Sequence, residues 1–275
     1  MLNFALIGCG RIAKRHSELL GYGQIKAGAQ LVAVCDNVFE KAEKIGKQFG
    51  VSAYSDMDEM MQREQVDVAV VLTPSGLHAE HVISLSKYGK DIMVEKPMTL
   101  TLDDADTMIE ACDRNGCQLF VIKQNRFNIP VVKLREAHQQ GRFGKLVLGT
   151  VRVRWARHQP YYDQDAWRGT WLMDGGVLTN QASHHVDMLE WMMGDVESVF
   201  AHATTALAKI EAEDTVVVTL KFKNGALGII EATTATRPRD LEGSISILGA
   251  KGSVVIGGFA VNQMQSWAFE DEQEG

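Results

Sequence analysis

The chain has 275 residues, of which 45% are hydrophobic and 23% are charged. At roughly 100–200 residues per domain this length favours two domains, and the composition excludes a disordered or collagen-like chain. The 28 basic residues against 35 acidic ones give a net charge of −7, and four of the acids lie within the last six residues. Without a broad basic field, we expect neither a nucleic acid nor an anionic membrane as a partner.

The N-terminus and the cysteines favour a cytoplasmic protein. Residues 1–10 lack a basic leading segment and run directly into a strand pattern, so we expect no signal peptide. No apolar run approaches the roughly 20 residues that span a bilayer. The four cysteines form no C-x-x-C pair, which favours reduced core thiols over a disulfide framework or a zinc site.

The first part of the chain alternates short apolar strands with helical patterns. Strands are predicted at residues 4–7, 31–35, 66–72, 91–94 and 118–122. Helices are predicted at residues 12–20, 38–49, 77–88 and 102–115. Strands this apolar, separated by helices, indicate a parallel sheet covered on both faces. We therefore expect an α/β, doubly wound Rossmann domain over residues 1–123.

The pattern changes after Lys123, and residues 124–275 are predicted to form an α+β domain. Helices are expected at residues 131–140 and 183–193, and an alternating strand pattern covers residues 146–155. Further strands are expected at residues 199–206, 215–222, 226–232, 243–248 and 253–256. Asn224-Gly225 is a hairpin signal between two of these strands. Strands that follow one another without long helices favour an open, mostly antiparallel sheet.

The first strand is followed by a dinucleotide-binding fingerprint, G-x-G-x-x-A. Gly8 allows the tight turn, Gly10 lets the backbone approach a pyrophosphate, and Ala13 permits close packing of the helix. Asp36 ends the second strand, where a carboxylate binds ribose hydroxyls and repels the 2′-phosphate of NADP. This pattern favours NAD, with a glycine turn that binds no dinucleotide as the alternative.

Two further strands end in polar residues at the sheet edge where open α/β sheets bind ligands. Thr73-Pro74 follows the third strand, with His78 shortly after, and Glu95-Lys96-Pro97 follows the fourth. A lysine desolvated in a cleft can share a proton or polarise an oxygen. The alternative is a surface lysine paired with Glu95, and the spacing alone does not decide between them.

A second group of polar residues surrounds the helix predicted at residues 183–193. His184 and Asp187 share a helix face, and a histidine oriented by a carboxylate is a common general base near neutral pH. The adjacent His185 must point elsewhere and is expected to be structural. A metal site is disfavoured because no cysteine or third histidine has helical ligand spacing.

The start of the second domain supplies hydrogen-bond donors from Gln124, Asn125 and Arg126. Arg126 could bind a carboxylate or phosphate through two parallel hydrogen bonds. An interdomain salt bridge is the alternative role for this arginine.

Together these motifs resemble the glucose–fructose oxidoreductase / inositol dehydrogenase (Gfo/Idh/MocA) family, from Asn3 to about Trp267. The resemblance implies NAD(P)-dependent oxidation or reduction of sugar-like hydroxyls, with Lys96 and His184 as the catalytic residues at the reacting carbon. It implies these cofactor-binding residues: Gly8, Gly10, Arg11, Ile12, Asp36, Thr73, Pro74, His78, Glu95, Lys96 and Gln124. It implies these substrate-binding residues: Lys96, Asn125, Arg126, Asp174, Asn180, Gln181 and His184. No metal is implied.

One departure from the family pattern is informative. Many members carry Asp where this chain has Asn180, and an amide cannot accept the proton, so that role falls to His184 or Lys96. The runs at residues 124–126, 167–171 and 180–185 look most like the subgroup that oxidises the 3-hydroxyl of UDP-N-acetyl-2-amino-2-deoxyglucuronate for bacterial surface polysaccharides. That resemblance implies a nucleotide-sugar substrate and 2-oxoglutarate as an electron acceptor.

Two other functions are considered beside this one. A free-sugar, inositol or diol dehydrogenase would use the same scaffold, and a non-catalytic nucleotide-sensing regulator would need neither Lys96 nor His184. We also expect a homo-oligomer, a dimer or tetramer formed through the open sheet. Because relatives usually continue several tens of residues past Trp267, we expect the C-terminal end to be shortened.

Overall fold

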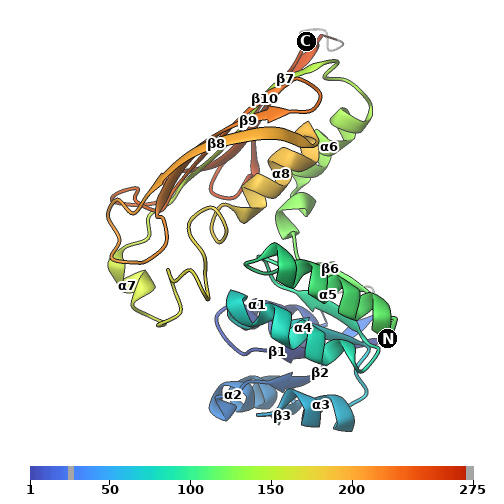
Figure 1. The fold of residues 1–275 in the computed structure, drawn as a ribbon. Helices are drawn as coiled ribbons and strands as arrows, with labels where there is room; N and C mark the ends of the chain where they lie inside the picture. The colour runs from blue at the N-terminus through green and yellow to red at the C-terminus, as the bar shows by residue number, and fades with distance from the viewer. Residues whose placement is uncertain (24–27, 271–275) are drawn as a thin grey trace. The chain divides into compact units, whose positions relative to one another are not determined.

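The computed structural model describes residues 1–23 and 28–270, so the acidic tail at 271–275 lies outside the described residues. The chain divides into two compact units, Met1–Ile122 and Lys123–Gly275. Each is a layered α/β structure (Figure 1). None of the described helices is long and apolar enough to cross a membrane. The four cysteines are buried free thiols.

The first unit is built on a six-stranded parallel sheet in the order β3-β2-β1-β4-β5-β6. Its strands are β1 (Leu2–Ile7), β2 (Ala29–Cys35), β3 (Ser52–Tyr54), β4 (Val68–Val71), β5 (Asp91–Val94) and β6 (Leu119–Val121). Its helices are α1 (Ala13–Gly21), α2 (Phe39–Phe49), α3 (Met57–Arg63), η1 (Ser75–Leu77), α4 (His78–Ser86) and α5 (Leu102–Asn115). This strand order is that of a Rossmann fold, which confirms the predicted class.

Both faces of this sheet are covered, because its strands are apolar on both sides. One face packs against α3, α4 and α5 through side chains such as Met60, Leu85 and Met108. The other face packs against α1 and α2 through Leu20 and Ala42. The carboxyl ends of the strands therefore remain the place for polar loops.

The second unit contains a seven-stranded sheet in the order β13-β12-β11-β7-β10-β9-β8, in which only the β7–β10 pair is parallel. Its strands are β7 (Leu146–Arg154), β8 (Val196–Thr204), β9 (Thr215–Phe222), β10 (Leu227–Thr233), β11 (Glu242–Gly249), β12 (Gly252–Gly257) and β13 (Gln263–Phe269). Its helices are η2 (Gln124–Phe127), α6 (Ile129–Gln139), α7 (Gln159–Tyr162) and α8 (Ser183–Met193). The mostly antiparallel sheet was expected because the predicted strands follow one another without long helices.

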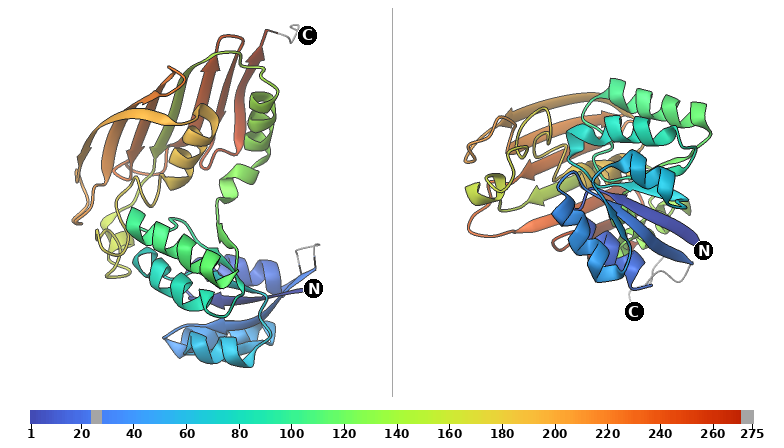
Figure 2. Two further views of the ribbon diagram at one scale, coloured as in Figure 1. Left: turned by 45° about the vertical axis from the view of Figure 1, so that its right-hand side comes forward. Right: turned by 90° about the horizontal axis from the view of Figure 1, so that it is seen from below.

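Helices α6 and α8 cover one face of this sheet (Figure 2). Met188, Leu189 and Met192 of α8 and Leu134 of α6 are at most 1% exposed in the core that they share with the strands. On the opposite side, here called the open face, the residues Phe200, Val217, Leu227 and Ile229 are 63%, 48%, 56% and 38% exposed. Near the C-terminal end of the central strand β7, Arg154 binds Glu231 at 2.6 Å and Glu242 at 3.2 Å on this face, and Arg152 lies 3.7–3.8 Å from the same two carboxylates.

Asp214 precedes β9 and fixes the loop that joins β8 to β9. Its buried carboxylate accepts hydrogen bonds from the backbone N–H groups of Ala206, Leu207 and Ala208 at 2.8–2.9 Å. Burial alone raises the pKa of Asp214, but these donors and the Thr215 hydroxyl lower it below its ordinary value. The loop is therefore held by an ionised acid.

Asp214→Asn should lower the free energy of unfolding by about 2–4 kcal/mol, because the amide presents NH₂ to donors that need an acceptor. The lowered pKa means that the stabilisation by Asp214 is present at neutral pH and lost as the pH falls through that pKa. Urea unfolding at neutral pH measures the loss. Asp195→Asn, at an exposed acid paired with Lys223, is the control and should change it by less than about 0.5 kcal/mol. Equal losses in the two variants would contradict this role.

Candidate active site

The glycine loop after β1 has the geometry that a dinucleotide needs. Gly8 has φ +96°, and a Cβ there would lie 2.8 Å from the backbone carbon of Leu72, so only glycine fits. At Gly10 a Cβ would meet no atom within 4 Å, which leaves open space where a pyrophosphate can approach the backbone. Ala13 is fully buried at the start of α1, and the neighbouring Arg11 and Ile12 are exposed. The residues present therefore fit a dinucleotide.

Asp36, which follows β2, is bonded to this loop. Its Oδ2 accepts a hydrogen bond from the backbone N–H of Cys9 at 2.7 Å, and its Oδ1 accepts one from Val38 at 2.9 Å. Each carboxylate oxygen has a second lone pair with which it can bind a ribose hydroxyl. The position of this negative charge suits NAD and opposes the extra phosphate of NADP.

Glu95 anchors the Glu95-Lys96-Pro97 segment that follows β5. Its side chain is buried, with Oε1 2.9 Å from Nε2 of His16 on α1 and Oε2 accepting from the backbone N–H of Lys96 at 3.0 Å. The Lys96–Pro97 peptide bond is cis. The two contacts join the helix of the glycine loop to the segment that carries Lys96. The partnership with His16 was not predicted, because these residues lie 79 positions apart.

His78 holds two of the strand-end segments together. It is 1% exposed, with Nδ1 2.8 Å from the carbonyl oxygen of Pro97 and Nε2 2.9 Å from that of Thr73. Burial lowers the pKa of His78 below its ordinary value, although the two carbonyl groups act in the opposite direction. The family resemblance implies a cofactor contact for His78. In this position its ring nitrogens face the backbone, so it serves the site by positioning Thr73 and Pro97.

In the second unit, the residues of η2 are tied to α8. Arg126 donates from Nε and Nη2 to the two carboxylate oxygens of Asp187, at 2.7 and 2.8 Å. Its guanidinium also lies 4.5 Å from the centre of the Trp191 ring, and Lys123 Nζ lies 3.7 Å from Asp187. The salt-bridge alternative is thus the arrangement found for Arg126, and it lies within this unit. Asn125 is buried and Gln124 is exposed.

The two adjacent histidines of α8 are both buried in its first turn, at 6% exposure for His184 and 0% for His185. The His185 ring lies 5.9 Å from that of Trp155 in an edge-on contact, and neither of its nitrogens has a hydrogen-bond partner among the described residues. Burial lowers the pKa of His185 to about 4. His185 is therefore a neutral core residue, as the sequence indicates.

The loop that leads into α8 carries the other predicted substrate-binding residues. Asp174 and Gln181 are 1% and 7% exposed, and Asp174 accepts hydrogen bonds from Gly169 and from the side-chain amide of Asn180. Glu213 supports the same loop, because its carboxylate accepts from the backbone N–H of Leu178 at 3.1 Å. No spacing rule relates Glu213 to this loop, so the sequence reasoning did not find it.

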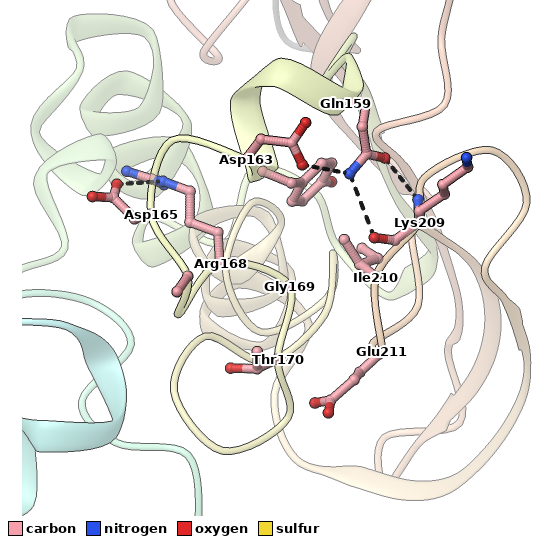
Figure 3. Close-up of a pocket in the computed structure, with 11 residues that line it drawn as sticks. Gln159, Asp163, Asp165, Arg168, Gly169, Thr170, Lys209, Ile210 and Glu211 are labelled. Carbon is pink, nitrogen blue, oxygen red and sulfur yellow. Dashed lines mark hydrogen bonds and ion pairs between the residues drawn. The ribbon is translucent and has the colours of Figure 1, made fainter.

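A hollow of about 550 Å³ lies beside this loop (Figure 3). Gln159 bridges Asp163 and the backbone of Lys209 on its rim. Arg168 donates to Asp165 at 2.9 Å and to the Tyr161 hydroxyl at 3.0 Å, and its guanidinium lies over the rings of Tyr161 and Trp167. The contribution of residues 209–211 to this hollow was not predicted. Among the described residues no group of three or more potential ligands could hold a metal ion.

Comparison with known proteins follows the division into two units. Residues 2–123 match the GFO/IDH/MocA oxidoreductase family with a NAD-binding Rossmann fold, and residues 131–255 match the GFO/IDH/MocA C-terminal domain. Solved structures of WlbA dehydrogenases from Bordetella pertussis and Chromobacterium violaceum, in complex with NADH and UDP-GlcNAcA, are each 43% identical to this chain, with a TM-score of 0.94. They match 99% of this chain and 83% and 78% of their own. A myo-inositol 2-dehydrogenase of Thermotoga maritima is 30% identical, over 100% of this chain and 79% of its own.

His185→Phe should make the free energy of unfolding less sensitive to acid. The folded state keeps His185 neutral, whereas the unfolded chain takes up a proton below pH about 6.5, so the wild type loses stability as the pH falls from there towards 4. Between pH about 6.5 and 5 the variant should lose about 1–2 kcal/mol less unfolding free energy than the wild type. Urea unfolding across this range measures the difference. An unchanged pH dependence in His185→Phe would refute the assignment.

Proposed function

Because this chain belongs to the GFO/IDH/MocA oxidoreductase family and uses NAD, we propose that it oxidises the C3 hydroxyl of UDP-GlcNAcA, the UDP-N-acetyl-2-amino-2-deoxyglucuronate expected from the sequence. The likeness to the two WlbA dehydrogenases carries this proposal, since it extends over 99% of the chain at 43% identity. A free carboxylate on the sugar and a diphosphate on its anomeric carbon define the substrate class. We place the reaction in the cytoplasmic assembly of a bacterial lipopolysaccharide.

The roles of the residues follow from the chemistry of alcohol oxidation. NAD, when bound, accepts the hydride that leaves C3. His184 takes the proton of the hydroxyl, and the Lys96 ammonium donates a hydrogen bond to the same oxygen and stabilises its developing negative charge. The C3 alcohol thus becomes a ketone, with one hydride and one proton removed. Glu95 and His78 hold the backbone on either side of Lys96.

Substrate recognition is assigned to buried amides. Asn125 and Gln181 are 8% and 7% exposed and supply the donors and acceptors that sugar and uronate groups require. Arg126 was expected to bind the uronate, but both carboxylate oxygens of Asp187 already occupy its Nε and Nη2. A direct contact of Arg126 with the uronate would therefore come from Nη1 or from the second hydrogen of Nη2.

The direct test is oxidation of UDP-GlcNAcA by the purified protein with NAD. We propose 2-oxoglutarate as the final electron acceptor. Where it is present, it would re-oxidise NADH and suppress the NADH absorbance, so the 3-keto product is detected by mass spectrometry instead. Myo-inositol and glucose are assayed in parallel, since the 30% identical inositol dehydrogenase supports a free-polyol substrate as the second candidate. Oxidation of a free polyol without oxidation of UDP-GlcNAcA would overturn the proposal.

Lys96→Met should bind NAD like the wild type and lose turnover by roughly a thousandfold, because the donor to the developing alkoxide is removed. Single-turnover product formation and NAD titration measure the two properties separately. Lys90→Met, at an exposed lysine before β5, removes a similar charge and should retain full turnover. Near-normal turnover of Lys96→Met would exclude Lys96 from the chemistry.

We further propose that the protein is a homodimer or homotetramer that pairs through the open face. Its exposed apolar residues lie on β8, β9 and β10, and beside them two arginines are paired with two glutamates, so this charged group is neutral and can meet its own copy across a two-fold axis. Light scattering should give two or four times the chain mass of 30.4 kDa.

Phe200→Glu on the open face should shift this mass towards that of one chain, because it buries an unpaired charge in the contact. Leu102→Glu adds the same charge at an exposed leucine of α5 and should leave the mass unchanged. A monomeric wild type, or an unaffected Phe200→Glu variant, would contradict pairing through this face.

A further inference from the structure

The carboxylate of Asp174 links two segments of the loop that leads into α8. Its Oδ2 accepts a hydrogen bond from the backbone N–H of Gly169 at 2.7 Å, and its Oδ1 accepts one from Nδ2 of Asn180. The residue is 1% exposed, so water does not compete for these contacts. Because an ionised carboxylate only accepts hydrogen bonds, the Asn180 amide must turn its NH₂ group towards Asp174.

The peptide group of Gly169 sets which atoms donate and which accept in these contacts, because its orientation is fixed. Its carbonyl oxygen accepts from the N–H groups of Glu211 and Ala212 at 3.1 and 3.0 Å. Gly169 has φ +70°, and a Cβ there would lie 2.6 Å from Cγ2 of Ile210, which packs against it (Figure 3). The Gly169 N–H is thus a fixed donor that demands an acceptor from Asp174.

We propose that Asp174 is a positioning residue that fixes the Asn180 amide with its Oδ1 turned away from Asp174, to accept a hydrogen bond from a hydroxyl of the sugar. Asn180 lies four residues before His184, and Ser183 Oγ donates to its carbonyl oxygen at 3.1 Å, which holds it at the entry to α8. This assignment rests on the proposed function only in requiring a polyhydroxy ligand. Asp174 itself is removed from the substrate and acts through Asn180.

The same geometry favours an amide over a carboxylate at position 180. A carboxylate at position 180 would touch the buried carboxylate of Asp174 and, because like charges at contact distance cannot both ionise cheaply, one of them would bind a proton. With Asp at position 174, an amide is the side chain that satisfies the pair without a proton. The residues at positions 174 and 180 therefore form a pair in which one side chain accepts the hydrogen bond that the other donates.

Exchanging the two side chains tests this unit without any substrate. Asn180→Asp should lower Tm by roughly 4 °C or more at pH about 7.5, and the deficit should shrink towards pH about 5 as the pair takes up a proton. The double variant Asp174→Asn with Asn180→Asp should regain Tm to within roughly 1 °C, because the new amide at position 174 can accept from Gly169 and donate to the new carboxylate at position 180. Gln164→Glu adds a carboxylate at an exposed position of the preceding segment and should leave Tm unchanged. Unaltered stability of Asn180→Asp, or no recovery in the double variant, overturns the pairing.

Turnover tests the orientation of the Asn180 amide. In Asp174→Asn the new amide must accept from Gly169, so its NH₂ faces Asn180 and turns that amide round, which should raise KM for the sugar by roughly tenfold and leave NAD affinity unchanged. The double variant should recover to within about threefold of the wild type. An unchanged KM in Asp174→Asn, or a double variant no better than it, contradicts the orientation. If the wild type oxidises another sugar instead of UDP-GlcNAcA, the proposed substrate fails and the same comparison is made with that sugar. If the wild type oxidises no sugar, the Tm values of the single and double variants still test whether Asp174 and Asn180 are paired.

Discussion

Buried or half-buried carboxylates that accept hydrogen bonds from backbone N–H groups hold several loops of this protein in place. Loops at the ends of strands have left the sheet ladder, and their backbone donors must find acceptors elsewhere. Asp36 supplies acceptors to the glycine loop, Glu95 to the segment of Lys96, and Asp174 and Asp214 to the segments on either side of the 550 Å³ hollow. Removing one acceptor therefore frees several donors at once, so a local change acts on a whole loop.

The hydrogen bonds to these carboxylates also reduce the effect of their negative charge on a bound dinucleotide. In the first unit the two acids lie beside segments that bind a negatively charged dinucleotide, yet each carboxylate is occupied by N–H donors, and Glu95 is paired with His16. Their charge is offset by these donors at short range, while the glycine backbone and the start of α1 would hold the phosphates of the dinucleotide. The acids thus position the cofactor loop without opposing the pyrophosphate, and Asp36 retains lone pairs for the ribose.

The sequence predicts what depends on local spacing and misses what depends on distant contacts. The apolar runs located most strands, and α8 begins and ends as predicted because its buried residues follow the helical period. The strand β3 has three half-exposed or exposed residues, and β13 is mostly exposed, so neither shows a clear alternation. In the candidate site, the glycine loop, Lys96 and His184 are predicted from motifs. The partners His16 of Glu95 and Arg126 of Asp187 are 79 and 61 positions away, and no spacing rule connects them.

These contacts also narrow the choice of a proton acceptor in the second unit. At the start of α8, Asn180 has no proton-accepting state near neutral pH, and His185 is held neutral in an apolar setting against Trp155. Asp187 directs both carboxylate oxygens to Arg126, and Asp174 is engaged by Gly169 and Asn180. Each of these groups is already committed to holding structure. The proposed division of roles, in which His184 takes the proton and Lys96 stabilises the charge on the oxygen, therefore requires none of these groups to leave its structural partners.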